Sequence, residues 1–387
     1  MDLYFMSFLG FIAALVILII WDRKNIDVEN YVMFMRRTQR GRGLIDKIAS
    51  RNKKFWNRVG DISTIVGIVG MVFAFIFIGY IFSQQVAGGG AASEGPAIVL
   101  PSPTGEATVR PGVVGVPFWQ WIIAILLLLV VHEGMHGIMT KTVNSKINSL
   151  GLVLFAIIPG AFVEPDEEDL NQKSWRDRVK VYSAGSFANF CLAGATVLFM
   201  SFVFLPSFTS PAIGYAGYVN ATEYGLETFP AERVNMTGDI LSIGGQRVKS
   251  SEGFLKELGK YNPGDSLEVQ TTSDNYTLQL SENPEDTDEP FMGIAGVSEA
   301  RILEDRYENT VWGEIINFFR ELLMWIFVLN FGIGIMNLLP LKPLDGGLIL
   351  EALSDNFYPE KSEKIVRAVS SISLLLLLTA LSMSFLA

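Results

Sequence analysis

The chain has 387 residues, of which 50% are hydrophobic, with a mean hydropathy of +0.34 and a formal net charge of −10 at pH 7. This composition excludes an ordinary soluble protein, and the negative charge gives no support for a nucleic-acid partner. The only cysteine, Cys191, excludes an intrachain disulfide.

Six long apolar runs predict membrane-spanning helices. A helix rises about 1.5 Å per residue, so about 20 residues cross the roughly 30 Å of hydrocarbon in a bilayer. The first run is followed by basic residues and has no small-residue cleavage site, so we expect a retained helix rather than a signal peptide. The runs cover residues 3–21, 62–82, 119–140, 181–208, 322–341 and 368–387.

The charges between these runs predict how the chain crosses the membrane. Residues 22–58 hold eleven Lys or Arg against four Asp or Glu, which predicts a basic cytoplasmic loop with an amphipathic helix along the membrane face. Residues 206–312 hold seven Lys or Arg against eighteen Asp or Glu and are expected outside the cell. We therefore expect a multi-pass protein of the plasma membrane. The three N-x-Ser/Thr sequons all lie in this outer segment, at Asn220, Asn235 and Asn275.

Two further stretches are too irregular to be spanning helices. Residues 83–117 contain repeated Gly and Pro around short β-prone pieces, which predicts an outer loop with a hairpin. Residues 147–163 are uncharged but interrupted by Pro159-Gly160, so we expect a re-entrant or protein-buried segment there.

Residues 220–300 predict a small soluble α+β domain. Its expected elements are a strand at 239–243, a helix at 251–260, and strands at 266–271, 276–280 and 291–294. This order and the run FPAERVNMTGDILSIGGQRV resemble a PDZ domain, with Asn235 where that family usually has glycine. Asn tolerates the left-handed backbone of such a turn. The resemblance implies a domain that pairs an edge strand with an extended peptide or excludes large substrates by size.

The chemistry-bearing residues lie in the run VVHEGMHG of the third apolar segment. His132 and His136 are the only histidines of the chain, and residues four apart share one face of a helix. The pair can therefore offer two imidazole nitrogens to one metal ion, with Glu133 within reach of a water on that ion. Ionisable groups within a span are costly and usually functional, which favours a metal site over a pair of core histidines.

A catalytic zinc ion usually has three protein ligands and one open position, and the chain has no third histidine. The third ligand is therefore a carboxylate or Cys191. Glu164, Asp166 and Asp345 are the candidate carboxylates. Asp345 follows the fifth apolar run in NLLPLKPLDGG, at a depth similar to that of the histidines, and the paired glycines after it allow close approach of the backbone.

At these residues the chain resembles the site-2 protease family of intramembrane metalloproteases, particularly its archaeal members. HEGMHG, AGSFANF and NLLPLKPLDGG occur in family order, with the PDZ-like insertion between the second and third. The resemblance implies that His132, His136 and Asp345 bind one Zn²⁺ ion and that Glu133 is the catalytic base. It also implies that Asn337 hydrogen-bonds the scissile peptide. Asn189 matches the family's Gly-x-x-x-Asn motif and is expected to support the core.

The expected fold is a polytopic α-helical membrane protein of about six transmembrane helices with an inserted PDZ-like domain. The expected function is intramembrane zinc proteolysis of membrane-protein substrates, at a site toward the cytoplasmic side. The sequence leaves open a membrane-anchored zinc peptidase that acts on soluble peptides and, with less support, a metal transporter or sensor. The expected regions are a first transmembrane helix (1–21), a basic cytoplasmic loop (22–58), a membrane core with the HExxH helix and the re-entrant segment (59–208), an extracytoplasmic PDZ-like domain (209–312) and C-terminal membrane helices with the NxxPxxPLDGG motif (313–387).

Overall fold

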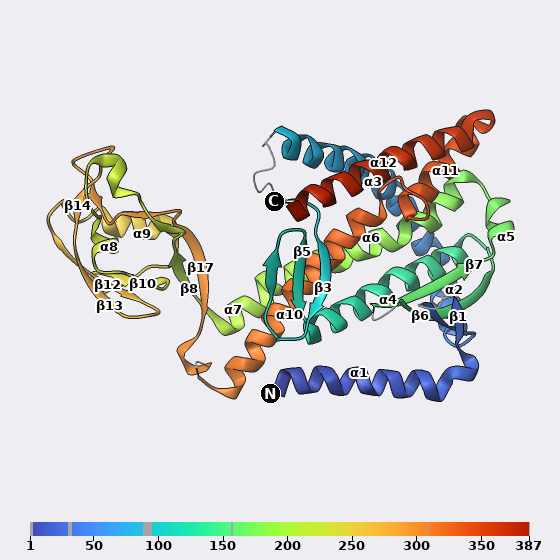
Figure 1. Cartoon of the computed structure of the whole chain (residues 1–387), viewed down its shortest axis with the longest axis horizontal. Helices are drawn as coiled ribbons and strands as arrows, with labels where there is room; N and C mark the ends of the chain where they lie inside the picture. Colours follow the sequence, from blue (N-terminus) through green and yellow to red (C-terminus); the bar gives the residue numbers. More distant parts are fainter. Residues whose placement is uncertain (1–2, 30–32, 88–94, 156–157, 308, 387) are drawn as a thin grey trace. The chain divides into compact units, whose positions relative to one another are not determined.

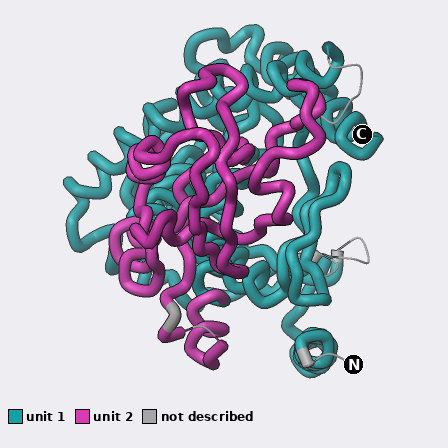
Figure 2. The backbone as a smooth tube through the Cα atoms, turned by 90° about the vertical axis from the view of Figure 1, so that its left-hand side faces the viewer, with its two compact units in different colours: residues 1–198, 318–387 teal, residues 199–317 magenta. Residues whose placement is uncertain are grey.

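The computed structural model describes residues 3–29, 33–87, 95–155, 158–307 and 309–386. The chain divides into two compact units, which Figure 2 distinguishes by colour. The first unit comprises residues 1–198 and 318–387, and the second comprises residues 199–317. The second unit contains the segment that the sequence predicts as an α+β domain.

Within the described residues, six helices are long and apolar enough to cross a membrane, which confirms the six expected spans by length and composition. Helix α6 continues through a π-helical turn, η2 (Met200–Phe204), into α7 (Leu205–Phe208). The long helices are α1 (Leu3–Asp22), α3 (Lys53–Ala87), α4 (Phe118–Thr142), α6 (Trp175–Phe199), α10 (Val311–Asn337) and α12 (Ser362–Leu386) (Figure 1).

Several helices extend beyond the apolar runs that predict them. Helix α3 begins at Lys53 instead of residue 62, and α6 begins at Trp175 instead of residue 181. The segments that precede these apolar runs contain Lys, Arg and Asn, which disfavour a helix only slightly. The helix can therefore continue beyond the hydrocarbon layer. Helix α4 is the most enclosed of the six, with 44% of its most apolar window buried against 0% for α1.

Four strands form an antiparallel sheet in the first unit, in the order β1-β2-β6-β7. The expected re-entrant segment is therefore a β-hairpin, which satisfies its backbone groups through strand pairing. The expectation of an amphipathic helix across residues 22–58 is wrong over much of that range, because two strands precede a helix of ten residues. The elements are β1 (Asp27–Glu29), β2 (Met33–Thr38), α2 (Arg42–Arg51), β6 (Ile147–Phe155) and β7 (Ile158–Pro165).

Helix α4 packs against both this sheet and helix α2. Strand β7 and α2 both contact α4. At Gly137 of α4 an added Cβ would lie 2.9 Å from Ile45 Cδ1 of α2, so the absence of a side chain there brings the two helices together. The sheet and α2 therefore lie against the part of α4 that contains the histidines (Figure 1).

The expected hairpin in residues 83–117 is confirmed for the described part of that loop. Strand β4 pairs antiparallel with β5, and β3 pairs parallel with β5 on its other side. These strands are β3 (Ile98–Ser102), β4 (Thr108–Arg110) and β5 (Val113–Pro117), and β5 leads directly into α4. Two shorter helices complete the first unit, α5 (Glu167–Asn171) and α11 (Asp345–Phe357).

The second unit contains a sheet in the order β13-β12-β10-β8-β17, with α9 packed against β10. Phe254 of α9 and Leu267 of β12 are almost fully buried in its core. Asn235 has φ +49°, as expected for the turn position where the PDZ family usually has glycine. The elements are β8 (Thr209–Gly214), β9 (Gly217–Tyr218), α8 (Pro230–Arg233), β10 (Ile240–Ile243), β11 (Gln246–Arg247), α9 (Ser251–Leu258), β12 (Ser266–Thr271), β13 (Asn275–Gln279), β14 (Ser281–Glu282), β15 (Pro290–Phe291), β16 (Ile294–Ala295) and β17 (Ser298–Leu303).

Candidate metal centre

Helix α4 presents both histidines to one point. The Nε2 atoms of His132 and His136 lie 3.1 Å apart, and the two rings are nearly perpendicular at 78°. This is the arrangement that a spacing of four residues predicts on a helix. His132 is buried and His136 is half-buried, so the pair is largely withdrawn from solvent.

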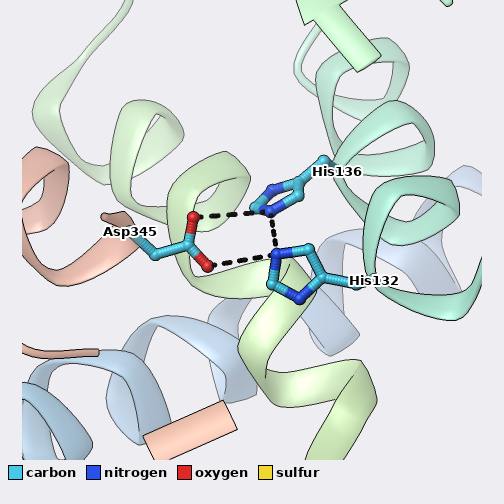
Figure 3. A group of neighbouring side chains, drawn as sticks. All are labelled: His132, His136 and Asp345. Atoms are coloured by element: carbon cyan, nitrogen blue, oxygen red, sulfur yellow. Dashed lines mark hydrogen bonds and ion pairs between the residues drawn. The ribbon is translucent and has the colours of Figure 1, made fainter. Parts of the chain in front are cut away.

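Asp345 completes the group from the first residue of α11. Its Oδ2 lies 3.6 Å from His132 Nε2, and its Oδ1 lies 3.5 Å from His136 Nε2 (Figure 3). The two glycines that follow it are required by a tight turn. An added Cβ would lie 2.1 Å from the carbonyl oxygen of Leu338 at Gly346, and 2.5 Å from the backbone nitrogen of Lys342 at Gly347.

The three side chains fit a tetrahedral metal ion. Zinc bonds of about 2.0–2.2 Å to nitrogen and oxygen place neighbouring ligand atoms about 3.3–3.6 Å apart. The two imidazole nitrogens lie 3.1 Å apart, each has one oxygen of Asp345 at 3.5 or 3.6 Å, and one ligand atom from each of the three residues lies within 4.8 Å of the others. Two imidazoles and one carboxylate are also the ligand type of a catalytic zinc site, which keeps one position open. Among the described residues, this is the one group of three such side chains within ligand distance.

The other candidate ligands of the sequence analysis have different roles. Glu164 accepts a hydrogen bond from the Ser149 hydroxyl in the sheet, and Asp166 caps the start of α5 through the backbone N–H of Asp169. Cys191 is exposed on α6. The structure thus brings together His132, His136 and Asp345 and leaves these three residues outside the group.

Helix α6 orients the ligands without contributing one. The Nδ1–H of His136 donates to the carbonyl oxygen of Val181 at 2.7 Å, which leaves Nε2 with a lone pair for a metal. The Ser186 hydroxyl donates to Asp345 Oδ2 at 3.0 Å. Both interactions hold a ligand in the geometry that Figure 3 shows, and the sequence analysis assigned neither.

Asn189 of α6 contacts the remaining imidazole. Its side chain is fully buried, and its Nδ2 lies 3.1 Å from His132 Nδ1. Its Oδ1 has no hydrogen-bond partner among the described residues. A metal on His132 Nε2 requires a proton on Nδ1, and that N–H must donate to an oxygen. We infer that the loaded site presents Asn189 Oδ1 to the ring, which gives the orphaned oxygen its partner. The expectation that Asn189 supports the core stays a prediction, and the structure places its buried side chain beside the candidate ligand His132.

Gly185 lets α6 approach this closely. An added Cβ there would lie 2.3 Å from His136 Nε2 and 2.7 Å from His132 Nε2. These distances are far below van der Waals contact, and the atoms approached are the proposed metal-binding nitrogens. Gly185, the glycine of AGSFANF, therefore leaves room for the two Nε2 atoms.

Glu133 lies beside the ligands and is connected to the sheet. Its Oε2 accepts a hydrogen bond from the backbone N–H of Val163 in β7 at 2.9 Å. Glu133 also lines the same cavity as the three ligand side chains, which has a volume of about 900 Å³. Ion pairs lie along this cavity, Arg178 with Asp355 and Lys342 with Glu351, so the cavity is polar as well as large.

Asn337, the last residue of α10, was predicted to contact the substrate, but it does not line this cavity. Its side chain is half-buried and makes no hydrogen bond to any part of the chain that the structure describes. Its expected contact with substrate remains a prediction.

Two comparisons with known proteins agree with this geometry. The model of peptidase family M50 matches residues 120–380, a range that contains all the ligands and Glu133. An uncharacterized protein of Methanocaldococcus jannaschii is 26% identical over 372 residues, which cover 93% of this chain and 90% of that protein.

Replacing Gly185 with alanine is expected to remove the metal. The added methyl group would overlap both imidazoles, so metal content measured by elemental analysis should fall to near background. Gly194→Ala on the same helix is the matched control, because no atom lies within 4 Å of an added Cβ there. Full metal content in Gly185→Ala would contradict the close approach of α6.

Substitutions of Asn189 should distinguish its role as an acceptor. Asn189→Leu removes the oxygen that would accept from His132 Nδ1–H in the loaded site, and loss of such a partner typically weakens metal affinity about 10–100-fold. Asn189→Asp supplies an acceptor oxygen and should keep affinity close to that of the unaltered protein. Competition with a chromogenic chelator measures both. Equal loss in the two variants would show that the residue acts only through packing.

Proposed function

The chain belongs to peptidase family M50, the site-2 protease family, and on that premise we propose that it is a zinc-dependent endopeptidase that cleaves peptide bonds in or near transmembrane segments of membrane-protein substrates. It is a membrane metallopeptidase by family and by its six long apolar helices. The proposal adds the identity of the metal, the substrate class and the site of cleavage.

The observation that supports this proposal most strongly is the position of Glu133. A carboxylate beside two histidines and an aspartate, with all four lining one cavity, is the set of groups that metal-assisted peptide hydrolysis requires. A metal carrier needs only the three ligands. Neither metal transport nor metal sensing accounts for Glu133, a second carboxylate that the backbone N–H of Val163 holds in place.

The residues divide the chemistry between them. Zinc, when bound by His132, His136 and Asp345, would act as a Lewis acid that polarises a carbonyl and lowers the pKa of water to about 7. Glu133 keeps Oε2 on the Val163 N–H, so its Oε1 would take the proton from the attacking water and return it to the leaving amine. Asn337 would donate a hydrogen bond from its amide to the oxygen of the scissile peptide.

The location of the site favours a substrate within the membrane. His132, Glu133 and His136 lie on α4, which is itself long and apolar enough to span. A substrate helix keeps its carbonyls in internal hydrogen bonds, so part of it must unwind before attack, and unwound backbone in a bilayer requires polar surroundings. The cavity offers such surroundings. From the positive-inside pattern, the site would lie toward the cytoplasm and the PDZ-like domain outside the cell, where it would select or filter substrates.

Glu133→Gln is expected to give a folded, zinc-loaded and inactive protein. The amide keeps the hydrogen bond to Val163 but cannot take a proton, and general-base catalysis typically contributes about 10²–10⁴-fold. Activity should be measured on a single-span membrane protein and on casein in the same detergent. Retained cleavage by the variant would refute the role of Glu133, and cleavage of casein alone would favour a membrane-anchored peptidase for soluble peptides.

Asn337→Ala should lower kcat while zinc content stays unchanged. Loss of one donor to a developing oxyanion typically costs about 10²–10³-fold in kcat. Elemental analysis together with steady-state kinetics makes this measurement. An unchanged kcat would show that another group stabilises the oxygen of the scissile peptide.

A further inference from the structure

A second cavity lies where α2, the start of α3 and the end of α4 meet. It has a volume of about 350 Å³ and shares no lining residue with the metal-site cavity. Three of its lining side chains are lysines, one from each helix. Its polar lining residues are Asp46, Lys47, Ser50, Lys53, Lys141 and Asn144.

The positive charges of this cavity, which we call the lysine cavity, exceed its negative charges. Lys141 Nζ lies 3.3 Å from Asp46 Oδ1, the only carboxylate in the lining. Lys53 Nζ donates to the neutral Asn144 Oδ1 at 2.5 Å. Lys47 has no hydrogen-bonding or ionic partner for its ammonium group in the part of the chain that the structure describes. The lining thus carries three ammonium groups and one carboxylate, and this excess of positive charge would attract an anion.

The helix ends account for only part of this arrangement. Lys141 lies in the last turn of α4, where the free carbonyl groups of the helix attract a cation. Lys47 and Lys53 have no such role. Lys53 is instead the first residue of α3, at the positive end of that helix, where a cation is disfavoured and an anion is favoured. Two lysines therefore remain for which the protein itself supplies no counter-charge.

The position of the cavity identifies the anion. Lys141 directly follows the apolar run of α4, and Lys53 precedes the apolar run of α3, so the cavity lies on the polar side of the hydrocarbon boundary, which is the side of the lipid headgroups. Leu44 and Phe55 beside the cavity are 62% and 51% exposed, as expected for side chains that contact lipid at an interface. We propose that the lysine cavity binds the phosphate group of an anionic phospholipid.

A phosphate there would connect two helices around the metal centre. Lys47 lies on α2 and Lys141 on α4, and α2 contacts α4 at Gly137, one residue after His136. A bound headgroup would hold α2 against that turn. Because a ligand that binds only the folded protein raises its stability, the lipid should raise the melting temperature.

The test compares the purified full chain in vesicles of phosphatidylcholine alone and in vesicles that also contain phosphatidylglycerol. Phosphatidylglycerol should raise the melting temperature and should remain bound in native mass spectrometry. Replacing both Lys47 and Lys53 with Gln should weaken that binding roughly 30-fold and remove the thermal shift. The double variant Lys54→Gln/Arg58→Gln is the matched control, because it removes the same charge from exposed positions of α3 outside the cavity.

A third variant is expected to change binding in the opposite direction. Asp46→Asn removes the one carboxylate of the cavity and should tighten binding of phosphatidylglycerol. A second arm adds inorganic phosphate or glycerol 3-phosphate to the protein in neutral detergent. Equal loss in the cavity and control variants, weaker binding by Asp46→Asn, or no response to phosphatidylglycerol would overturn the proposal. A full thermal shift from the soluble phosphates would overturn the assignment to a lipid and leave a phosphate site.

Discussion

The close approach of helices α4 and α6 is the constraint on which the metal centre depends. Gly185 is the residue of α6 that faces the two Nε2 atoms, and no larger residue fits there. On either side of it, the same helix supplies the carbonyl group of Val181, the hydroxyl group of Ser186 and the amide of Asn189. Helix α6 contains none of the three candidate ligands, yet it contacts the side chain of each of them.

This arrangement also lowers the free-energy cost of burying polar groups in an apolar protein. Burying an unpaired polar group costs several kcal/mol in hydrocarbon, where no water can replace a lost hydrogen bond. Both imidazoles, Asp345 and Glu133 each have a partner from another element. The partners come from α6 and β7. The packing of α6 and the sheet against α4 therefore also orients the proposed catalytic groups.

The sheet of the first unit links Glu133 to the basic segment near the N-terminus. Val163 of β7 holds Glu133, and β6 and β2 continue the sheet into the basic segment near the N-terminus. Helix α2 of that segment packs against the histidine helix at Gly137. Basic residues of this segment therefore belong to elements that contact the helix of the two histidines, and the lysine cavity lies at that contact.

The sequence by itself determined the six spans and the pairing of the two histidines on one helix face, because both follow from local patterns. About 20 apolar residues specify a span, and histidines four apart share a helix face whatever surrounds them. The secondary structure of the inserted domain was predictable for the same reason, since strand alternation and turn residues act over a few positions.

Only the tertiary structure decided what depends on distant parts of the chain. Glu164, Asp166, Asp345 and Cys191 were all candidate third ligands in the sequence, with Asp345 favoured by its depth, and the fold brought Asp345 alone of these to the histidines. Residues 147–163 formed a hairpin with partners more than a hundred residues earlier in the chain, which no local pattern contains. The roles of Val181, Ser186 and Gly185 also remained hidden, because a backbone carbonyl, a hydroxyl and a missing side chain become functional only through what packs against them.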